Sequence, residues 1–349
     1  MTAPPLFAIK AQADLHHAWF LGLQLMVSSR KSPDVMEDWM FRLFRRQHLE
    51  KFLGSFDKLG LTGLPDAVAC AKYHVLSNVI GGVPVDYMQE SETKAWLRFR
   101  YPRWMCDGPV LCGLPASVGR GFMRGWYAHN GISLGNPRLG FVCVSEDVTG
   151  EFGFCGYFKE YDHDLADNER LQFAKGDLPP PYDPAMQPRP PANNWPAERL
   201  EKAARNYAMD YIRNGLAELA TVIGATEALE IGGLSARLIG LQYYPKMAGI
   251  IGAKDGDVVD ARAFLMTMMA GMGDKTHALE GATSTRADFE QTGLRILRDL
   301  EDTDRNLVLD CWAELWQGCV KSHSNLLTLD MQQPSYDRLH WSVQDLRSL

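Results

Sequence analysis

The sequence predicts an α+β fold made of two related domains, each with helices packed on a small antiparallel sheet. Runs of helical periodicity alternate with short strand-like runs, in the same order in both halves of the 349-residue chain. The segment 174–197 holds eight prolines and almost no apolar periodicity, so it predicts a linker. We therefore expect a first domain at 1–173 and a second at 198–349.

In the first half, apolar residues recur at helical spacing within 14–58, and Leu64-Pro65-Asp66 is a typical start for a further helix that ends near Val79. A long helix is predicted at Pro115–His129. Runs rich in β-branched and aromatic residues predict the strands Ala95–Tyr101, Gly140–Ser145 and Phe152–Tyr161. The last two strands are close enough in the chain to form a hairpin.

The second half returns to helical periodicity over residues 198–250. Further helices are predicted at Asp260–Met272 and Thr303–Leu327. Candidate strands are Ala287–Leu297 and Ser335–Val343. The four methionines of 260–272 are typical of adaptable core packing.

A diverged internal duplication is predicted from this order of elements and from the two long helices. Both helices carry an apolar stripe that ends in a histidine at the same spacing: Val118, Phe122, Trp126 and His129 in the first, and Trp312, Trp316, Val320 and His323 in the second. The runs before the helices, ETKAWLRFR and FEQTGLRIL, are also similar. The first domain is the expected working copy, because the second lacks its cysteine loop and helix glycines.

Composition excludes some partners and sites. The net charge of −7 and the pI near 5.7, without a Lys/Arg-rich tract, argue against a nucleic-acid partner. The apolar run Ala18–Val27 is shorter than the roughly 20 residues that span a bilayer. We expect a cytoplasmic protein without a membrane partner. Seven cysteines with no CxxC pair argue against disulfides and a zinc ribbon.

The stretch Arg103–Pro137 is the candidate functional centre. Its helix contains Gly119, Gly121 and Gly125, which predict close approach of the backbone to another element or to a ligand. His129 ends the apolar stripe and is a candidate general acid or base, or a metal ligand. A core histidine with a hydrogen-bonded ring explains the pattern equally well. Asn130 follows it and is a candidate substrate-binding residue on the rim of a polar pocket.

Two cysteines of the same stretch are candidate nucleophiles. Cys106 and Cys112 flank a short loop that contains Asp107, which we take as a possible substrate-binding residue. Cys112 lies just before the predicted helix, whose N-terminus lowers a thiol pKa. The alternative is that both are buried, as free cysteines often are.

Glu160, Asp162 and His163 form the densest titratable cluster. They are candidates for proton transfer, and the acids could bind a divalent cation. Solvated side chains at a strand end are the alternative, and no metal site is assigned.

Arg100 and Arg103 are candidates for binding a substrate carboxylate, which a guanidinium holds through two hydrogen bonds. Trp126 is a candidate for contact with an apolar or aromatic part of the substrate.

Motifs of several large classes are absent from the sequence. It contains no GxGxxG after a strand, no Walker loop, no GxSxG and no HExxH. No motif requires a cofactor. An enzyme acting on a small carboxylate- or aromatic-bearing molecule by hydrolysis or lyase chemistry is the leading expectation, with a homodimer possible. A small-molecule sensor or carrier, with Trp126, Phe122 and Trp104 lining an apolar pocket, is the first alternative. A metal- or haem-binding protein using His129 and His163 is the second.

The runs AWLRFRYPRWMCDG, SVGRGFMRGWYAHNG and LGFVCVSE resemble the L-2-amino-thiazoline-4-carboxylic acid hydrolase family and, more distantly, vinyl-reductase-like small-ligand domains. The resemblance implies an α+β domain with a pocket between helix and sheet, acting on a small organic acid. Members of that family are usually single-domain, so the doubled length departs from the family pattern.

Overall fold

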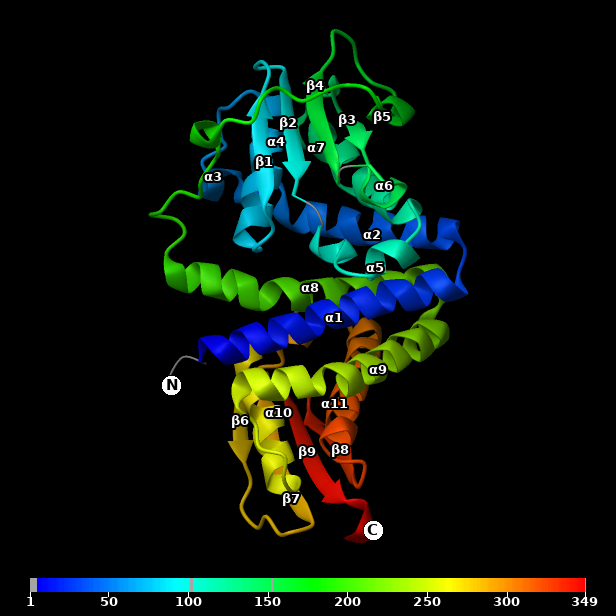
Figure 1. Ribbon diagram of the computed structural model, residues 1–349, viewed down its shortest axis with the longest axis vertical. Helices are drawn as coiled ribbons and strands as arrows, with labels where there is room; N and C mark the ends of the chain where they lie inside the picture. The colour runs from blue at the N-terminus through cyan, green and yellow to red at the C-terminus, as the bar shows by residue number, and fades with distance from the viewer. Residues whose placement is uncertain (1–4, 101–102, 152, 349) are drawn as a thin grey trace. The chain divides into compact units, whose positions relative to one another are not determined.

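The computed structural model describes residues 5–100, 103–151 and 153–348, which fold into two compact units (Figure 1). One unit is Val27–Ala204, and the other combines Met1–Met26 with Arg205–Leu349. These bounds differ from the predicted 1–173 and 198–349, because the first 26 residues belong with the second half. Buried polar contacts hold them there: Trp19 Nε1 donates to Ser235 Oγ at 3.1 Å, and Trp312 Nε1 donates to His16 Nε2 at 3.2 Å.

The fold class is confirmed as α+β, with helices packed on two small sheets. The helices are α1 (Leu6–Arg30), α2 (Pro33–Lys51), α3 (Phe56–Leu59), α4 (Asp66–Ile80), α5 (Val110–Gly113), α6 (Ser117–Gly125), α7 (Asn130–Leu134), α8 (Ala197–Ile223), α9 (Ala225–Ile251), α10 (Val258–Met272) and α11 (Asp302–His323). The strands are β1 (Val85–Gln89), β2 (Lys94–Phe99), β3 (Leu139–Ser145), β4 (Cys155–Glu160), β5 (Leu171–Phe173), β6 (Lys275–Ala278), β7 (Arg286–Thr292), β8 (Leu327–Ser335) and β9 (Arg338–Asp345).

The unit Val27–Ala204 holds a sheet of order β1-β2-β4-β3-β5. Its strands are antiparallel except that β5 runs parallel to β3 at the edge. The predicted hairpin of β3 and β4 is confirmed. Two ends of predicted strands, Tyr101 and Phe152, lie outside the described residues.

The proline-rich segment 174–197 lies against this sheet. It contains no strand and, before α8 begins at Ala197, only the short 3-10 turn Pro184–Met186. The Gln187 side chain caps β1 by accepting from Tyr87 N and donating to Tyr87 O, each at 2.9 Å. Tyr157 Oη also donates to Asp177 at 2.7 Å. The segment is therefore part of the covering of the first unit.

The second sheet has the order β6-β7-β9-β8 and is fully antiparallel. In both units a first hairpin is followed by a helical segment and then by a second hairpin. The second strand of the first hairpin pairs with the second strand of the other: β2 pairs with β4, and β7 pairs with β9. The units thus share one strand connectivity. An origin by internal duplication stays a prediction.

Three predicted elements end earlier than expected. The helix predicted at Thr303–Leu327 ends at His323, and Leu327 begins β8. The helix Pro115–His129 breaks at Gly125, and a 3-10 turn Tyr127–His129 leads into α7. The strand Ala287–Leu297 stops at Thr292 because Gly293 takes a φ of +78°, which turns the chain out of the sheet.

The glycines of α6 permit a close crossing with α2, as the sequence predicted. A Cβ at Gly121 would lie 2.5 Å from Glu37 O and 2.8 Å from Met40 Cβ, and one at Gly125 would collide with Phe41 O. Only glycine allows two helix backbones to come this near. The crossing fixes the direction in which the polar side of α6 faces.

Candidate functional site

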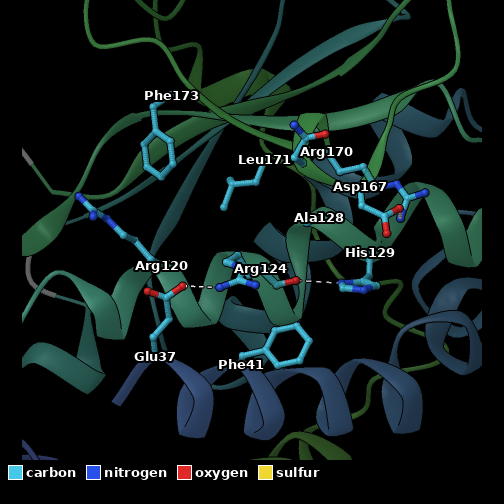
Figure 2. A pocket seen from close by; sticks show the side chains of 11 residues that line it. Glu37, Phe41, Arg120, Arg124, Ala128, His129, Asp167, Arg170, Leu171 and Phe173 are labelled. Carbon is cyan, nitrogen blue, oxygen red and sulfur yellow. Dashed lines mark hydrogen bonds and ion pairs between the residues drawn. The ribbon is translucent and has the colours of Figure 1, made fainter. Parts of the chain in front are cut away.

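A cavity of about 490 Å³ lies beside α6 in the unit Val27–Ala204 (Figure 2). Helix α2 contributes two of its residues, α6 and the turn after it four, and β5 with the segment that leads into it the rest. The lining residues are Glu37, Phe41, Arg120, Arg124, Ala128, His129, Asp167, Asn168, Arg170, Leu171 and Phe173. We call this the arginine–histidine cavity.

Three arginines face this cavity from two parts of the chain. Arg120 and Arg124 are one turn apart on α6, opposite its buried apolar residues, and Arg170 immediately precedes β5. The side chains of Arg120 and Arg124 are 50% and 57% exposed. Their guanidinium groups can therefore reach a solute that enters the cavity.

Each of these arginines already has one acidic partner. Arg120 Nε lies 3.4 Å from a Glu146 oxygen, and Arg124 Nη1 lies 2.5 Å from a Glu37 oxygen. Arg170 Nη1 lies 2.9 Å from an Asp167 oxygen. A guanidinium has five N–H donors, and each of these ion pairs engages a single nitrogen. Donors therefore remain for a ligand.

Two aromatic rings flank the arginines. The Arg124 guanidinium carbon lies 5.6 Å from the centre of the Phe41 ring, and that of Arg120 lies 5.9 Å from the centre of the Phe173 ring. Phe173 is a large apolar side chain that is 46% exposed on an edge strand. The cavity thus offers apolar ring faces next to cationic donors, which suits an amphipathic anion.

His129 supplies the titratable group of the cavity. Its Nδ1 lies 2.8 Å from Arg124 O, and because a carbonyl only accepts, Nδ1 carries the proton. The other nitrogen, Nε2, is then the basic one. Burial and the positive charge of Arg45 lower the pKa of His129. The ring is therefore neutral at neutral pH and able to accept a proton.

Asn130 and Trp126, both predicted to bind substrate, are buried behind the cavity. The Asn130 side-chain amide lies 2.8 Å from His74 Nε2, and the Trp126 ring is 5.9 Å from the rings of both His48 and His74. Burial, the main cause, lowers the pKa of His48 to about 3 and that of His74 well below its usual value. Neutral histidines in the core support the site from behind.

Cys106 and Arg103 are also buried. Arg103 forms an ion pair with Asp147, and its guanidinium carbon lies 5.0 Å from the centre of the Phe122 ring. Burial raises the pKa of the Cys106 thiol to about 11, so at neutral pH the thiolate that a nucleophile needs is scarce. The geometry does not support Cys106 as a nucleophile.

The remaining predicted residues lie elsewhere in the unit. Asp107 is exposed on the loop before α5, and Cys112 is exposed on α5. Arg100 Nε lies 3.0 Å from Asp86, and Arg100 contacts neither Glu160 nor Asp162 in any described hydrogen bond or ion pair.

The strand-end cluster at 160–163 is split between two ion pairs. Glu160 lies 2.6 Å from Arg138, and His163 Nδ1 lies 2.8 Å from Asp162. The Asp162 side chain is almost fully exposed. Of the predicted residues only His129 lines the arginine–histidine cavity. Cys106, His129 and Asp162 do not share it.

Sequence reasoning missed the arginines of the cavity. Arg120 and Arg124 occur four residues apart on the polar side of a helix that was already singled out, and this spacing was the available signal. Glu37, Asp167 and Arg170 come from distant parts of the chain, and no local pattern connects them to α6.

Over the described parts of the chain, no group of three or more His, Cys, Asp or Glu side chains is arranged to hold a metal ion. Within the same residues, no helix has both the length and the apolar character needed to cross a membrane. Comparisons with protein-family models, with curated proteins and with solved structures found no match to this chain. The resemblance to the thiazoline-carboxylate hydrolases stays a prediction.

Proposed function

We propose that the unit Val27–Ala204 binds a small carboxylate-bearing molecule in the arginine–histidine cavity and that His129 acts on it as a general base. The observation that carries the proposal is the convergence of Arg120, Arg124 and Arg170 on one cavity beside a histidine of fixed tautomer. The reaction class is hydrolysis or lyase chemistry.

The charge of the cavity selects an anion. A guanidinium group binds a carboxylate through paired N–H donors, and Arg120, which has only a long contact to Glu146, is the best placed to do so. The exposed ring of Phe173 beside it would cover a flat apolar part of the same molecule. A volume of about 490 Å³ fits a small organic acid.

The chemistry follows from the His129 ring. With its Nδ1 proton held by Arg124 O, the neutral ring presents a lone pair on Nε2. In hydrolysis this nitrogen would take a proton from a water molecule as the water oxygen attacks the substrate and the scissile bond breaks. In an elimination it would take the proton from the carbon next to the carboxylate while a substituent on the following carbon leaves with the bonding electron pair. The arginines would stabilise the negative charge that develops on the substrate. No step requires a cysteine.

Binding without catalysis, as in a sensor or carrier, is the second candidate. It is favoured by the burial of Cys106 and by the exposed position of Asp162, which leave His129 as the only predicted catalytic residue on the cavity. The two candidates share the ligand class and differ only in turnover.

The test uses the full chain with a panel of aliphatic and aromatic carboxylates, measured by isothermal titration calorimetry. Arg120→Gln is expected to weaken binding about 10- to 100-fold, because the variant loses a charge-assisted hydrogen bond to the carboxylate. Arg138→Gln is the matched control, because Arg138 is equally exposed and paired with Glu160 outside this cavity. Equal affinities of wild type and Arg120→Gln would refute the proposal.

Turnover is followed by mass spectrometry for each carboxylate that binds. His129→Gln is expected to keep the affinity and to lose conversion, because glutamine cannot take up the proton. Conversion that persists in His129→Gln removes His129 from the mechanism. Binding with no conversion in the wild type assigns the sensor or carrier function.

A further inference from the structure

A second cluster of arginines lies in the other unit, around the turn that joins α10 to β6. Gly273 ends α10 and Asp274 follows it. A Cβ placed on Gly273 would lie 2.6 Å from Arg295 Nε and 3.1 Å from both Cζ and Nη1 of Arg205. The two guanidinium groups therefore meet at the same glycine. Arg298 is near enough to repel Arg205 as well.

The single carboxyl group that attracts Arg205 is largely engaged. Asp274 Oδ2 accepts from Gln291 Nε2 at 2.8 Å, and its Oδ1 accepts from the backbone N–H of Arg295 at 3.1 Å. Burial raises the pKa of Asp274 to about 7, so near neutral pH this carboxyl carries only part of a negative charge. The charge of Asp337 also raises the pKa of Asp274, so the three guanidinium groups face two nearby carboxyl groups, one of them only partly ionised.

Arg205 is the least compensated of the three. It is 7% exposed, and its buried Nε has no hydrogen-bond acceptor. Within the described residues its guanidinium takes part in no hydrogen bond or ion pair. Burial, the main cause, and the charges of Arg295 and Arg298 lower the pKa of Arg205. A buried cation without a partner is strongly unfavourable, so the arrangement requires a counter-charge.

We infer that Arg205, Arg295 and Arg298 form a binding site for a small oxyanion, a phosphate or carboxylate group, at the Gly273 turn. Arg205 lies on α8, whereas Arg295 begins the 3-10 turn Arg295–Leu297 and Arg298 caps the same turn. Donors from two parts of the chain therefore come together here, as in sites that bind anions through several N–H groups. Arg295 is half-buried and Arg298 is exposed, so part of the cluster is in contact with solvent. Gly273, at a φ of +88°, has no side chain to block the approach of the guanidinium groups.

This site is separate from the arginine–histidine cavity, because the two share no residue and belong to different units. It therefore does not depend on the proposed function. Its chemistry also differs, since the charged neighbours of Arg205 among the described residues are arginines and Asp274, with no histidine beside it. The site is a binding site, and no reaction is assigned to it.

The experiment measures thermal unfolding of the full chain in sodium phosphate, in sodium acetate and in sodium chloride, all at equal ionic strength. Phosphate or acetate is expected to raise the midpoint of the unfolding transition above its value in chloride, because a ligand that binds only the folded state stabilises it. Arg205→Met is expected to abolish this rise, and Arg298→Gln, an exposed position, to reduce it. A rise with phosphate alone assigns a phosphate-bearing ligand, and a rise with both salts assigns a general oxyanion site.

Two controls make the result specific. Arg286→Gln removes a half-exposed arginine of the same unit that pairs with Asp288, and it should keep the full rise. Arg124→Gln removes a donor of the other cavity and should also keep it. Equal midpoints in the three salts overturn the inference, as does a rise that survives unchanged in both Arg205→Met and Arg298→Gln.

Discussion

The crossing of α2 and α6 gives a prediction whose size can be worked out from distances. In Gly121→Ala, the new methyl group would lie 2.5 Å from Glu37 O and 3.0 Å from Phe41 N, where ordinary contacts begin at about 3.4 Å. Both neighbours are backbone atoms of α2, so no side-chain rotation relieves the clash. The helices must separate by about 0.9 Å at this point.

Such overpacking costs about 1–3 kcal/mol, and alanine regains up to about 1 kcal/mol of helix propensity. We therefore expect Gly121→Ala to destabilise the unit Val27–Ala204 by about 1 kcal/mol, and by about 2 kcal/mol at most. Gly119→Ala is the matched control on the same helix, because the nearest atom to its Cβ is Arg103 Nη2 at 3.8 Å. It should gain about 0.5–1 kcal/mol from propensity alone.

The assay is urea unfolding of the full chain followed by circular dichroism. The chain has two compact units, and only the transition of Val27–Ala204 should move. The reasoning is refuted if Gly121→Ala and Gly119→Ala have the same midpoint, since the close crossing would then not exist in solution.

Three further outcomes are expected. Burial lowers the pKa of His16 to about 4, so the stability that its neutral ring contributes is complete above about pH 6.5 and is lost as the pH falls toward 4. At about pH 5 the free energy of unfolding, measured in urea, should be lower by about 2 kcal/mol for this reason. The variant His16→Gln should not show this decrease. Asp147→Asn leaves Arg103 buried and unpaired and should cost about 3–5 kcal/mol in the same assay, whereas Glu198→Gln, at an exposed ion pair, should leave the unfolding midpoint nearly unchanged. A thiol reagent should modify Cys112 in the native protein and the other described cysteines only after unfolding. If the folded Cys112→Ser variant still reacted, the burial of Cys106 would be contradicted.

Sequence periodicity predicted those parts of the fold that are set by local pattern. The strands β3 and β4 are apolar runs separated by a Thr149-Gly150 turn, and α10 and α11 have long apolar stripes. Strand β1 was not predicted because it is only five residues long and the buried Asp86 interrupts its apolar residues. Strand β5 was not predicted because it is only three residues long and pairs with a neighbouring strand on one side only.

Of the arginine–histidine cavity, the sequence predicted only the residue whose type indicates a functional role without knowledge of its neighbours. His129 was found because a histidine at the end of an apolar stripe is conspicuous. The arginines around it were not, because a surface arginine and a cavity arginine look the same until the partner element is known. Arg170 reaches the cavity through the parallel pairing of β5 with β3, a long-range contact that no local pattern encodes.

The position of β5 at the edge of its sheet has a consequence for exchange with solvent. This strand carries Leu171 and Phe173 of the cavity wall, and the two backbone hydrogen bonds at its ends, from Phe141 N to Arg170 O and from Ala174 N to Cys143 O, are each 2.9 Å long. A short edge segment of this kind opens at a much lower free energy than the central strands. Local unfolding of β5 would remove this part of the cavity wall, and the amide of Ala174 should exchange with deuterium well before those of the β2–β4 pair.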